Sequence, residues 1–156
     1  MKGKTVRESR TEQVHLVRNT HINGNQRLFG GSLMQWIDTV GGVVARRHSG
    51  REITTACVDN LQFRSAVVIN STVVLIGKMT YVGRTSMEVR VDTFVESLEG
   101  IRTLVNTAYL VFVALDDEGR PVPVPRLILE TDQEKAEFEN GARRQTLRKE
   151  RRNQGY

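Results

Sequence analysis

Residues 23–38 read NGNQRLFGGSLMQWID, and this stretch decides the fold of the chain. A loop of short polar residues, with Gly24 as its expected tight point, leads into the pair Gly30-Gly31, and the apolar segment that follows continues to His48. At about 100° per residue, the large apolar side chains of this segment fall on one broad side. They are Leu33, Trp36, Ile37, Val40, Val43 and Val44. The pattern predicts a helix from Gly30 to about His48, with one face directed to a core.

The start of this helix carries two features that suggest acyl chemistry. The first N–H groups of a helix have no partner within it, so Gly30 and Gly31 offer donors to a developing negative charge. Asp38 lies two turns inside the helix, nearly opposite its apolar side. A carboxylate among apolar residues is costly unless it is paired or used. An anion-stabilising helix start and an acid are therefore combined in one element.

The face around Asp38 admits two interpretations. One is the solvated face of an amphipathic helix that happens to carry an Asp. A solvated face should contain Lys, Glu or Arg, however, and residues 32–45 contain none. Gly41 and Gly42 each cost about 1 kcal/mol relative to Ala in mid-helix, which the close approach of another backbone, a subunit or a ligand would explain. A functional or interface role for this face is therefore favoured.

The rest of the chain has the pattern of an antiparallel sheet. Residues 86–96 alternate between apolar and charged side chains, which predicts one buried face, one solvated face and antiparallel pairing. A single long apolar helix is available to cover the sheet, so we expect an α+β fold in which a curled antiparallel sheet wraps around this helix. Strands are expected at 11–18, 53–63, 72–82, 86–96 and 104–115.

Composition divides the chain into three parts. Residues 1–11 are polar and expected to be flexible. Residues 12–130 form the α+β domain, and residues 131–156 form a charged helix or tail. Thr131 is the expected N-cap of that helix, with Glu134 completing a capping box.

The net charge of +5 is concentrated in the tail. Residues 142–156 carry a charge of +5, and the other 141 residues sum to zero. Nucleic-acid binding by the whole protein is therefore not expected, and the tail lacks the interleaved aromatic side chains of an RNA-binding arm. We expect a solvated helix with pairs such as Glu139–Arg143; contact with an anionic ligand or another subunit is the alternative.

Cysteine use and hydropathy indicate a cytoplasmic protein. Cys57 is the only cysteine; it excludes an internal disulfide, fits a reducing compartment and is expected to be a small buried apolar residue. No apolar window approaches the length of a membrane span, and no segment resembles a signal peptide, so no membrane partner is expected. No Cys/His spacing indicates zinc.

Several motifs, in the same order, resemble the hotdog-fold acyl-CoA thioesterases, specifically the cytosolic acyl-CoA hydrolases. The resemblance covers residues 14–129. It implies a hotdog fold and hydrolysis of acyl-CoA to a free acid and coenzyme A, with no metal or redox cofactor. It also implies a homo-oligomer, a dimer of hotdogs that is often tripled into a hexamer. The motifs are residues 28–38 with 45–48, 54–59, 83–89, and 113–116 with 122–125.

The resemblance also assigns roles at the helix. Asp38 matches the acid that serves as general base or nucleophile, and the N–H groups of Gly30 and Gly31 would hold the thioester oxygen. A polar loop residue, usually Asn, completes the family's site from the neighbouring subunit. Counting back from Asp38 places Asn23 at this position, and aligning on the loop glycine places His21 there.

Asn23 is preferred for this role and His21 comes second, while Asn25 is a third possibility. Asn25 and Phe29 are expected beside the substrate. Asp59 is expected to be a structural partner of an arginine or a loop N–H, and His15 and His48 to serve packing.

The segment Gly83-Arg84-Thr85-Ser86 resembles the part of the family's site that binds coenzyme A. Arg84 would meet a phosphate, and Thr85 and Ser86 would donate from their hydroxyls. An ordinary turn arginine is an equally weighted interpretation of Arg84.

Two other functions remain open on the sequence. One is a non-catalytic module that binds or senses acyl-CoA. The other is a hotdog enoyl-CoA hydratase or dehydratase, which needs a histidine near the helix paired with an acid; His21 is the candidate histidine.

Overall fold

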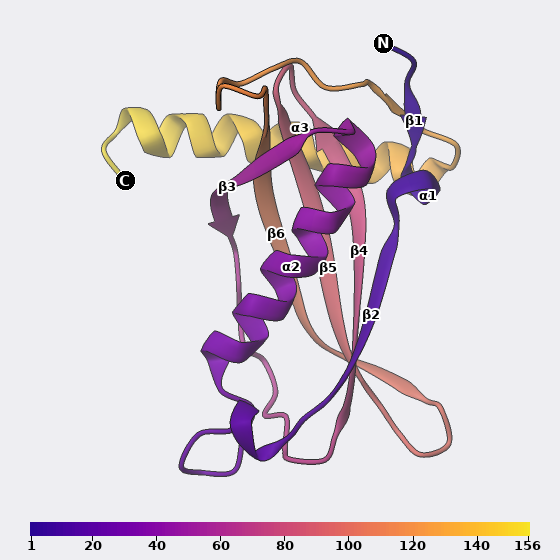
Figure 1. Cartoon of the computed structure of the whole chain (residues 1–156), viewed down its shortest axis with the longest axis vertical. Coiled ribbons are helices and arrows are strands. Elements are labelled where there is room, and N and C mark those ends of the chain that lie inside the picture. The colour runs from indigo at the N-terminus through magenta and orange to yellow at the C-terminus, as the bar shows by residue number, and fades with distance from the viewer.

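The computed structural model describes residues 1–156 and shows a five-stranded antiparallel sheet curled around helix α2 (Gly30–Ser49) (Figure 1). Helix α2 crosses one face of the sheet, and helix α3 (Asp132–Asn153) lies across the other (Figure 1). The predicted α+β architecture is confirmed. The strands lie in the order β2-β4-β5-β6-β3, with bounds β2 Thr11–Leu16, β3 Glu52–Asp59, β4 Thr72–Val82, β5 Ser86–Glu96 and β6 Arg102–Leu115.

Helix α2 packs closely on the inner face of the sheet. A Cβ atom on Gly41 would lie 2.9 Å from the ring of Phe112 in β6, and one on Gly77 in β4 would lie 2.8 Å from Val40 Cγ1. The mid-helix glycine at position 41 is thus explained by contact with the sheet. The helix ends at Gly50, whose φ of 66° lies in the left-handed region that glycine adopts most readily.

The outer face of β5 was expected to be solvated, but helix α3 covers part of it. Glu88 is 1% exposed because helix α3 covers it. Gly141 allows this close approach, since a Cβ there would lie 2.6 Å from Tyr81 Cβ. Thr131 caps α3 as predicted, with its side chain accepting a hydrogen bond from the Glu134 N–H at 3.1 Å. The predicted capping box is not completed, because Glu134 Oε2 accepts from the Glu130 N–H at 2.7 Å and not from that of Thr131.

The tail is therefore not the solvated helix that its charge pattern predicts. The expected Glu139–Arg143 pair does not form, and Arg144, Arg148 and Arg151 bind carboxylates of the sheet. An alternation of charges along a strand does not reveal whether a second helix will neutralise them.

The N-terminal residues, expected to be flexible, carry secondary structure. Strand β1 (Lys4–Thr5) pairs in parallel with β7 (Leu127–Ile128), and the short helix α1 (Val6–Ser9) follows. Val6 and Ser9 are buried. Two-residue strands are too short to show a period in the sequence, and their partner lies far along the chain.

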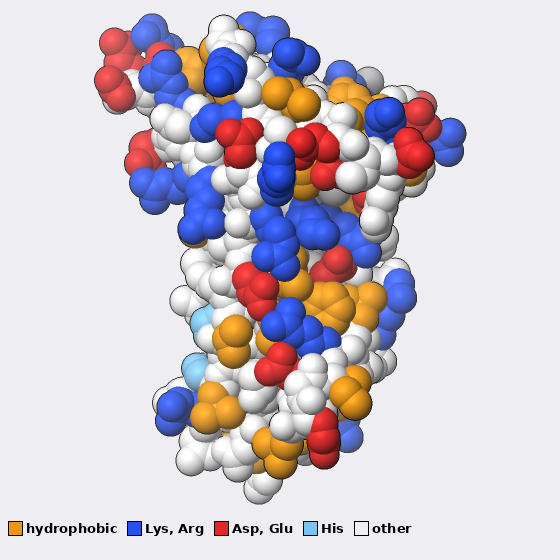
Figure 2. Space-filling model, turned by 90° about the vertical axis from the view of Figure 1, so that its right-hand side faces the viewer, with side chains coloured by type: hydrophobic (Ala, Val, Ile, Leu, Met, Phe, Trp, Pro, Cys, Tyr) orange, Lys and Arg blue, Asp and Glu red, His pale blue; other side chains and the backbone are white.

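Charged side chains of both signs cover the surface. Figure 2 shows a face on which Lys and Arg are interspersed with Asp and Glu, with hydrophobic side chains between them. No helix of the chain has the length and apolar composition needed to cross a membrane.

The two central glycines of α2 provide a matched stability test. Gly41→Ala should destabilise the protein by roughly 1–2 kcal/mol, because overpacking against Phe112 exceeds the gain in helix propensity. Gly42→Ala should stabilise it by up to about 1 kcal/mol, since its Cβ would lie 3.7 Å from Ile53 Cδ1, an ordinary contact. Denaturant unfolding at fixed protein concentration measures both, and equal effects would contradict the packing described.

The burial of His48 predicts that the free energy of unfolding falls in mild acid. Its ring is fully buried, Nε2 lies 2.8 Å from the Pro125 carbonyl oxygen as a donor, and Nδ1 has no partner. Burial lowers the pKa of His48 below its ordinary value of 6.5, although the hydrogen bond to Pro125 opposes the shift. The unfolded chain therefore binds the proton more readily, so this contribution is present above about pH 6.5 and is lost as the pH falls.

The measurement is the unfolding free energy from about pH 7.5 to about pH 5. His48→Gln keeps a donor for Pro125 but cannot titrate, so its pH dependence should be shallower than that of the wild type. Burial also lowers the pKa of His15, so part of the slope should remain. An unchanged slope in His48→Gln would contradict the assignment.

Candidate active site

Asp38 projects from the middle of α2 toward strand β3. Its Oδ1 accepts a hydrogen bond of 2.8 Å from Thr55 Oγ1, and both side chains are open to solvent. Asp38 is thus paired, but it is not enclosed within this chain. A carboxylate held in one orientation and exposed on one side can accept a proton from water or attack a bound carbonyl.

A β-bulge at Ala56 allows β3 to present Thr55 to the helix. Thr55 pairs with Phe112, whereas Cys57 pairs with the adjacent Val111. Paired residues point to the same face of a sheet, and Phe112 faces α2 while Val111 lies on the opposite face. The extra residue therefore turns the second half of β3 over. Thr55 faces α2, and Cys57 faces α3, where it is only partly buried.

The start of α2 presents free backbone donors. The N–H groups of Gly30 and Gly31 have no acceptor within the chain, as expected for a first helical turn. The ring of Phe63 lies 3.4 Å from the position of a Cβ on Gly30, and that of Phe29 lies 2.5 Å from one on Gly31. Both rings are more than half exposed. Glycine at each position thus leaves room for an aromatic ring where a Cβ atom would otherwise lie.

A hollow of about 380 Å³ adjoins this helix start, lined by Gly30, Leu33 and Phe63 together with Asn23 and Arg27. The Asn23 side chain shapes the loop: its Oδ1 accepts from the Asn25 N–H at 2.9 Å and from the Arg27 N–H at 3.4 Å. Asn23 therefore lies beside the free donors of α2. Asn25 is exposed and contributes only its N–H to this turn.

His21 has different surroundings. Its Nδ1 accepts from the Arg18 N–H at 3.0 Å, and its ring meets Trp36 edge-on at 5.0 Å between centroids. His15 stacks on the same indole at 4.2 Å. Within this chain neither His21, Asn23 nor Asn25 hydrogen-bonds Asp38.

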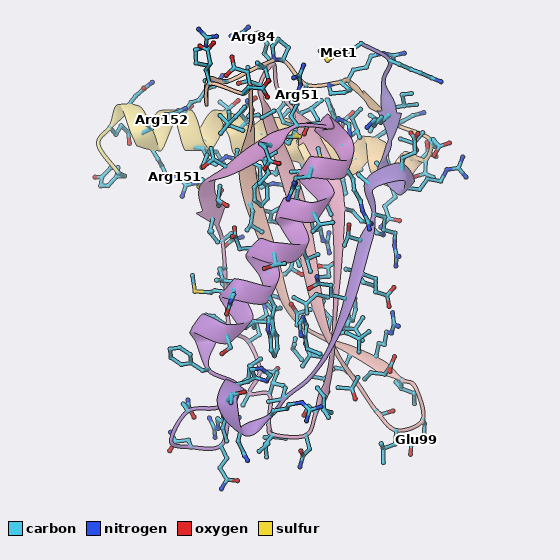
Figure 3. All side chains as sticks on the ribbon, in the orientation of Figure 1. Met1, Arg51, Arg84, Glu99, Arg151 and Arg152 are labelled. Atoms are coloured by element: carbon cyan, nitrogen blue, oxygen red, sulfur yellow. The ribbon has the colours of Figure 1, made fainter.

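The segment from Gly83 to Ser86 forms a tight turn at the end of the sheet away from the start of α2. The Gly83 N–H donates to the Ser86 carbonyl at 2.9 Å, the Thr85 carbonyl accepts from Ala114 of β6, and the Arg84 carbonyl accepts from Val124 in the segment that follows β6. Arg84 is exposed, and its guanidinium makes no ion pair in the chain. Figure 3 shows Arg84 at that end.

The predicted site residues thus form two groups within one chain. The start of α2 and the turn between β4 and β5 lie toward opposite ends of the sheet (Figure 1). Thr55, the partner of Asp38, is instead level with Met87, the residue after Ser86, because both pair with Phe112. Thr85 and Ser86 line a hollow of about 630 Å³ between the end of β3 and helix α3.

Thr55 is the residue to which sequence reasoning assigned no role. It lies in the 54–59 motif of the resemblance, but a threonine in a strand has no chemical signature of its own. Its pairing with Asp38 depends on the bulge at Ala56, which the sequence pattern does not reveal.

Comparison with known proteins agrees with this geometry. The family model described as "Thioesterase superfamily" matches residues 25–100. The uncharacterized acyl-CoA thioester hydrolase YkhA of Bacillus subtilis is 39% identical over 146 residues, which cover 93% of this chain and 85% of that protein. This chain belongs to the thioesterase superfamily, and its sheet wrapped around a helix is the hotdog fold.

A longer relative is the human cytosolic acyl coenzyme A thioester hydrolase. It is 35% identical over 156 residues, which cover 97% of this chain but 40% of the human protein. The chain thus spans less than half the length of this relative.

Two solved structures are similar over nearly the whole chain. The acyl-CoA hydrolase of Staphylococcus aureus, in complex with butyryl coenzyme A, coenzyme A and coenzyme A disulfide, has a TM-score of 0.92 and 32% identity, covering 97% of this chain and 93% of that one. Variants of that enzyme with an Asn, an Asp or a Thr replaced by Ala have TM-scores of 0.94, 0.93 and 0.92. An apo-hexameric acyl-CoA thioesterase has a TM-score of 0.92 and 35% identity, covering 97% of both chains.

Proposed function

We propose that this protein is an acyl-CoA thioesterase that hydrolyses acyl-CoA to a free carboxylic acid and coenzyme A. The observation that carries the proposal is the hydrogen bond from Thr55 of β3 to Asp38 of α2. Asp38 belongs to the helix whose first turn presents the free N–H groups of Gly30 and Gly31. The names of the similar proteins and the coenzyme A complexes of the S. aureus enzyme support the substrate class.

In the proposed reaction the thioester oxygen accepts hydrogen bonds from the N–H groups of Gly30 and Gly31 of one protomer, and Asp38 acts from its partner. Within one helix the eight residues between Gly30 and Asp38 span about 12 Å, too far for both to reach one carbonyl group. Asp38 takes a proton from water as the water oxygen bonds to the carbonyl carbon. The carbon–sulfur bond then breaks, and the thiolate leaves and takes up a proton. In the alternative, Asp38 attacks the carbonyl carbon and expels the thiolate, which takes up a proton; water then hydrolyses the resulting anhydride to the free acid and restores the Asp38 carboxylate. One preorganised oxyanion donor contributes about 3 kcal/mol in measured cases.

Residue spacing supports Asn23 as the polar loop residue. In the S. aureus enzyme the replaced Asn and Asp lie 15 positions apart, and the replaced Asp and Thr lie 17 apart. Asn23, Asp38 and Thr55 have the same separations in this chain. Since Asn23 does not bond Asp38 within one chain, we propose that it acts across a subunit interface, in a dimer of hotdogs or a hexamer of three such dimers.

The remaining proposed contacts belong to coenzyme A. Arg84 has no ion-pair partner and is proposed to bind a phosphate, with Gly83, Thr85 and Ser86 contributing donors around it. Phe29 and Asn25 are proposed to contact the acyl end near the helix start. The start of α2 and the β4–β5 turn lie toward opposite ends of one chain, and we propose that the two groups that meet one substrate come from different subunits.

The two alternative functions have less support. His21 accepts a backbone N–H and has no carboxylate partner, so the acid–histidine pair of a hydratase is not formed in this chain. A sensing module remains distinguishable by experiment, because it would bind coenzyme A without turnover.

Hydrolysis of a panel of acyl-CoAs, followed with a thiol reagent, tests the function. Asp38→Ala should lower kcat at least about 100-fold, the usual contribution of a general base. Asp117→Ala, which removes another exposed carboxylate, is the matched control and should retain full activity. A folded Asp38→Ala protein with full activity would overturn the mechanism, and binding without turnover by the wild type would favour the sensing module.

We also propose that hydrolysis needs no metal ion or redox cofactor. No group of three or more His, Cys, Asp or Glu side chains in the chain is placed to hold a metal. Activity should therefore be unchanged after dialysis against a chelator. A loss of activity that added divalent cations restore would contradict this part of the proposal.

A further inference from the structure

A buried carboxylate lies on the outer face of the sheet, away from Asp38. Glu88 of β5 is 1% exposed, and Arg144 of α3 binds both of its oxygens, at 2.8 and 3.0 Å. Thr80 Oγ1 donates to Glu88 Oε1 at 2.6 Å. The Arg144 guanidinium also lies 3.8 Å above the centre of the Tyr109 ring. A carboxylate this deeply buried requires such partners, so the position of α3 on the sheet is strongly determined.

Arg148 extends this network to the edge strand. One of its nitrogens, Nη1, lies 2.9 Å from Glu88 Oε2 and 3.3 Å from Asp59 Oδ2. A single nitrogen thereby joins β5 to the last residue of β3. The Arg148 side chain is 12% exposed, so water screens these contacts little.

Arg151 makes a weaker contact with the same strand. Its Nη2 lies 3.2 Å from both oxygens of Asp59, but its side chain is 52% exposed, which reduces the contribution of the ion pair. Figure 3 shows Arg151 beside the end of β3. Arg148 is therefore the principal connection between β3 and the buried network.

Within one chain, strand β3 has a neighbour on one side only, so a contact from α3 adds to its restraint. It lies at the edge of the sheet and pairs with β6 alone. The bulge at Ala56 interrupts that pairing between Thr55 and Cys57. Asp59 lies three residues after the bulge, and Thr55 lies just before it. Whatever holds Asp59 therefore also limits the movement of the bulge and of Thr55.

We propose that Arg148 is a positioning residue for hydrolysis. It binds Asp59 to the buried Glu88, fixes β3 on the far side of the bulge, and so keeps Thr55 Oγ1 in hydrogen-bonding distance of Asp38. The proposal rests on the function proposed above. It gives the basic tail a role in orienting the catalytic acid from the opposite face of the sheet.

The test is Arg148→Met in the full-length protein. Glu88 keeps Arg144 and Asp59 keeps Arg151, so neither carboxylate loses its last partner and the protein should fold. We expect kcat to fall about tenfold with the KM for acyl-CoA unchanged within about twofold, as expected when a group that acts on the chemical step is displaced. Arg148→Lys should recover most of the loss, because one nitrogen makes both contacts. Arg143→Met removes an exposed cation of the same helix and should behave as wild type.

A double-mutant cycle separates positioning from general stability. Thr55→Ala should lower kcat at least as much as Arg148→Met, and adding Arg148→Met to Thr55→Ala should cause no further loss. Asp59→Asn should reproduce the effect of Arg148→Met. Hydrogen exchange should become faster in residues 52–59 of Arg148→Met and remain unchanged in residues 72–82.

The outcomes that overturn the inference are distinct. Additive losses in the double variant would indicate a merely structural role. A raised KM with unchanged kcat would instead make Arg148 a substrate-binding residue. Full activity of Arg148→Met beside an active wild type would overturn this inference and leave the proposed function intact. A wild type that hydrolyses no acyl-CoA would overturn the proposed function and, with it, the inference.

Discussion

Helix α2 packs on the sheet at Gly41, where the Phe112 ring occupies the space that a Cβ would fill. Close packing at this point fixes the rotation of the helix about its axis, since a turn in either direction would drive neighbouring side chains into β6. Asp38 lies three positions earlier and is thereby directed to Thr55 on β3. The first turn of the same helix carries the free N–H groups of Gly30 and Gly31. The placement of acid and donors relative to the sheet therefore depends on this close contact between a ring and a helix backbone.

The edge strand β3 connects the two helices that lie on opposite faces of the sheet. Its first half bonds to α2 through Thr55, and its last residue, Asp59, bonds to α3 through Arg148 and Arg151. Edge strands have fewer partners than central strands and open more readily. In this chain, ion pairs on the outer face supply part of the restraint that a second neighbouring strand would provide.

The sequence was sufficient to predict those parts of the fold that have a strong local pattern. The apolar side of α2 and the alternation in β5 predicted a helix inside an antiparallel sheet, and Thr131 was correctly placed as the cap of α3. Asp38 was singled out because its face of the helix lacks Lys, Glu and Arg. These features depend on neighbours a few residues apart.

Features that depend on distant segments were missed. The burial of Glu88 requires α3, and an alternating charge pattern looks the same whether the charges meet water or arginines. Thr55 reaches Asp38 only because Ala56 is bulged, and the pairing of β1 with β7 joins segments more than a hundred residues apart. The sequence also favoured Gly24 as the tight point of the loop, whereas the left-handed backbone is at Gln26, with a φ of 57°.

The bulge at Ala56 also determines which sequence changes strand β3 can accept. Its residues are largely exposed, so many substitutions at single positions should leave the fold undisturbed. Deletion of one residue would restore regular alternation and leave either Thr55 or Asp59 on the wrong face. Related chains should therefore differ freely in the side chains along this strand but keep the same number of residues between the positions of Thr55 and Asp59.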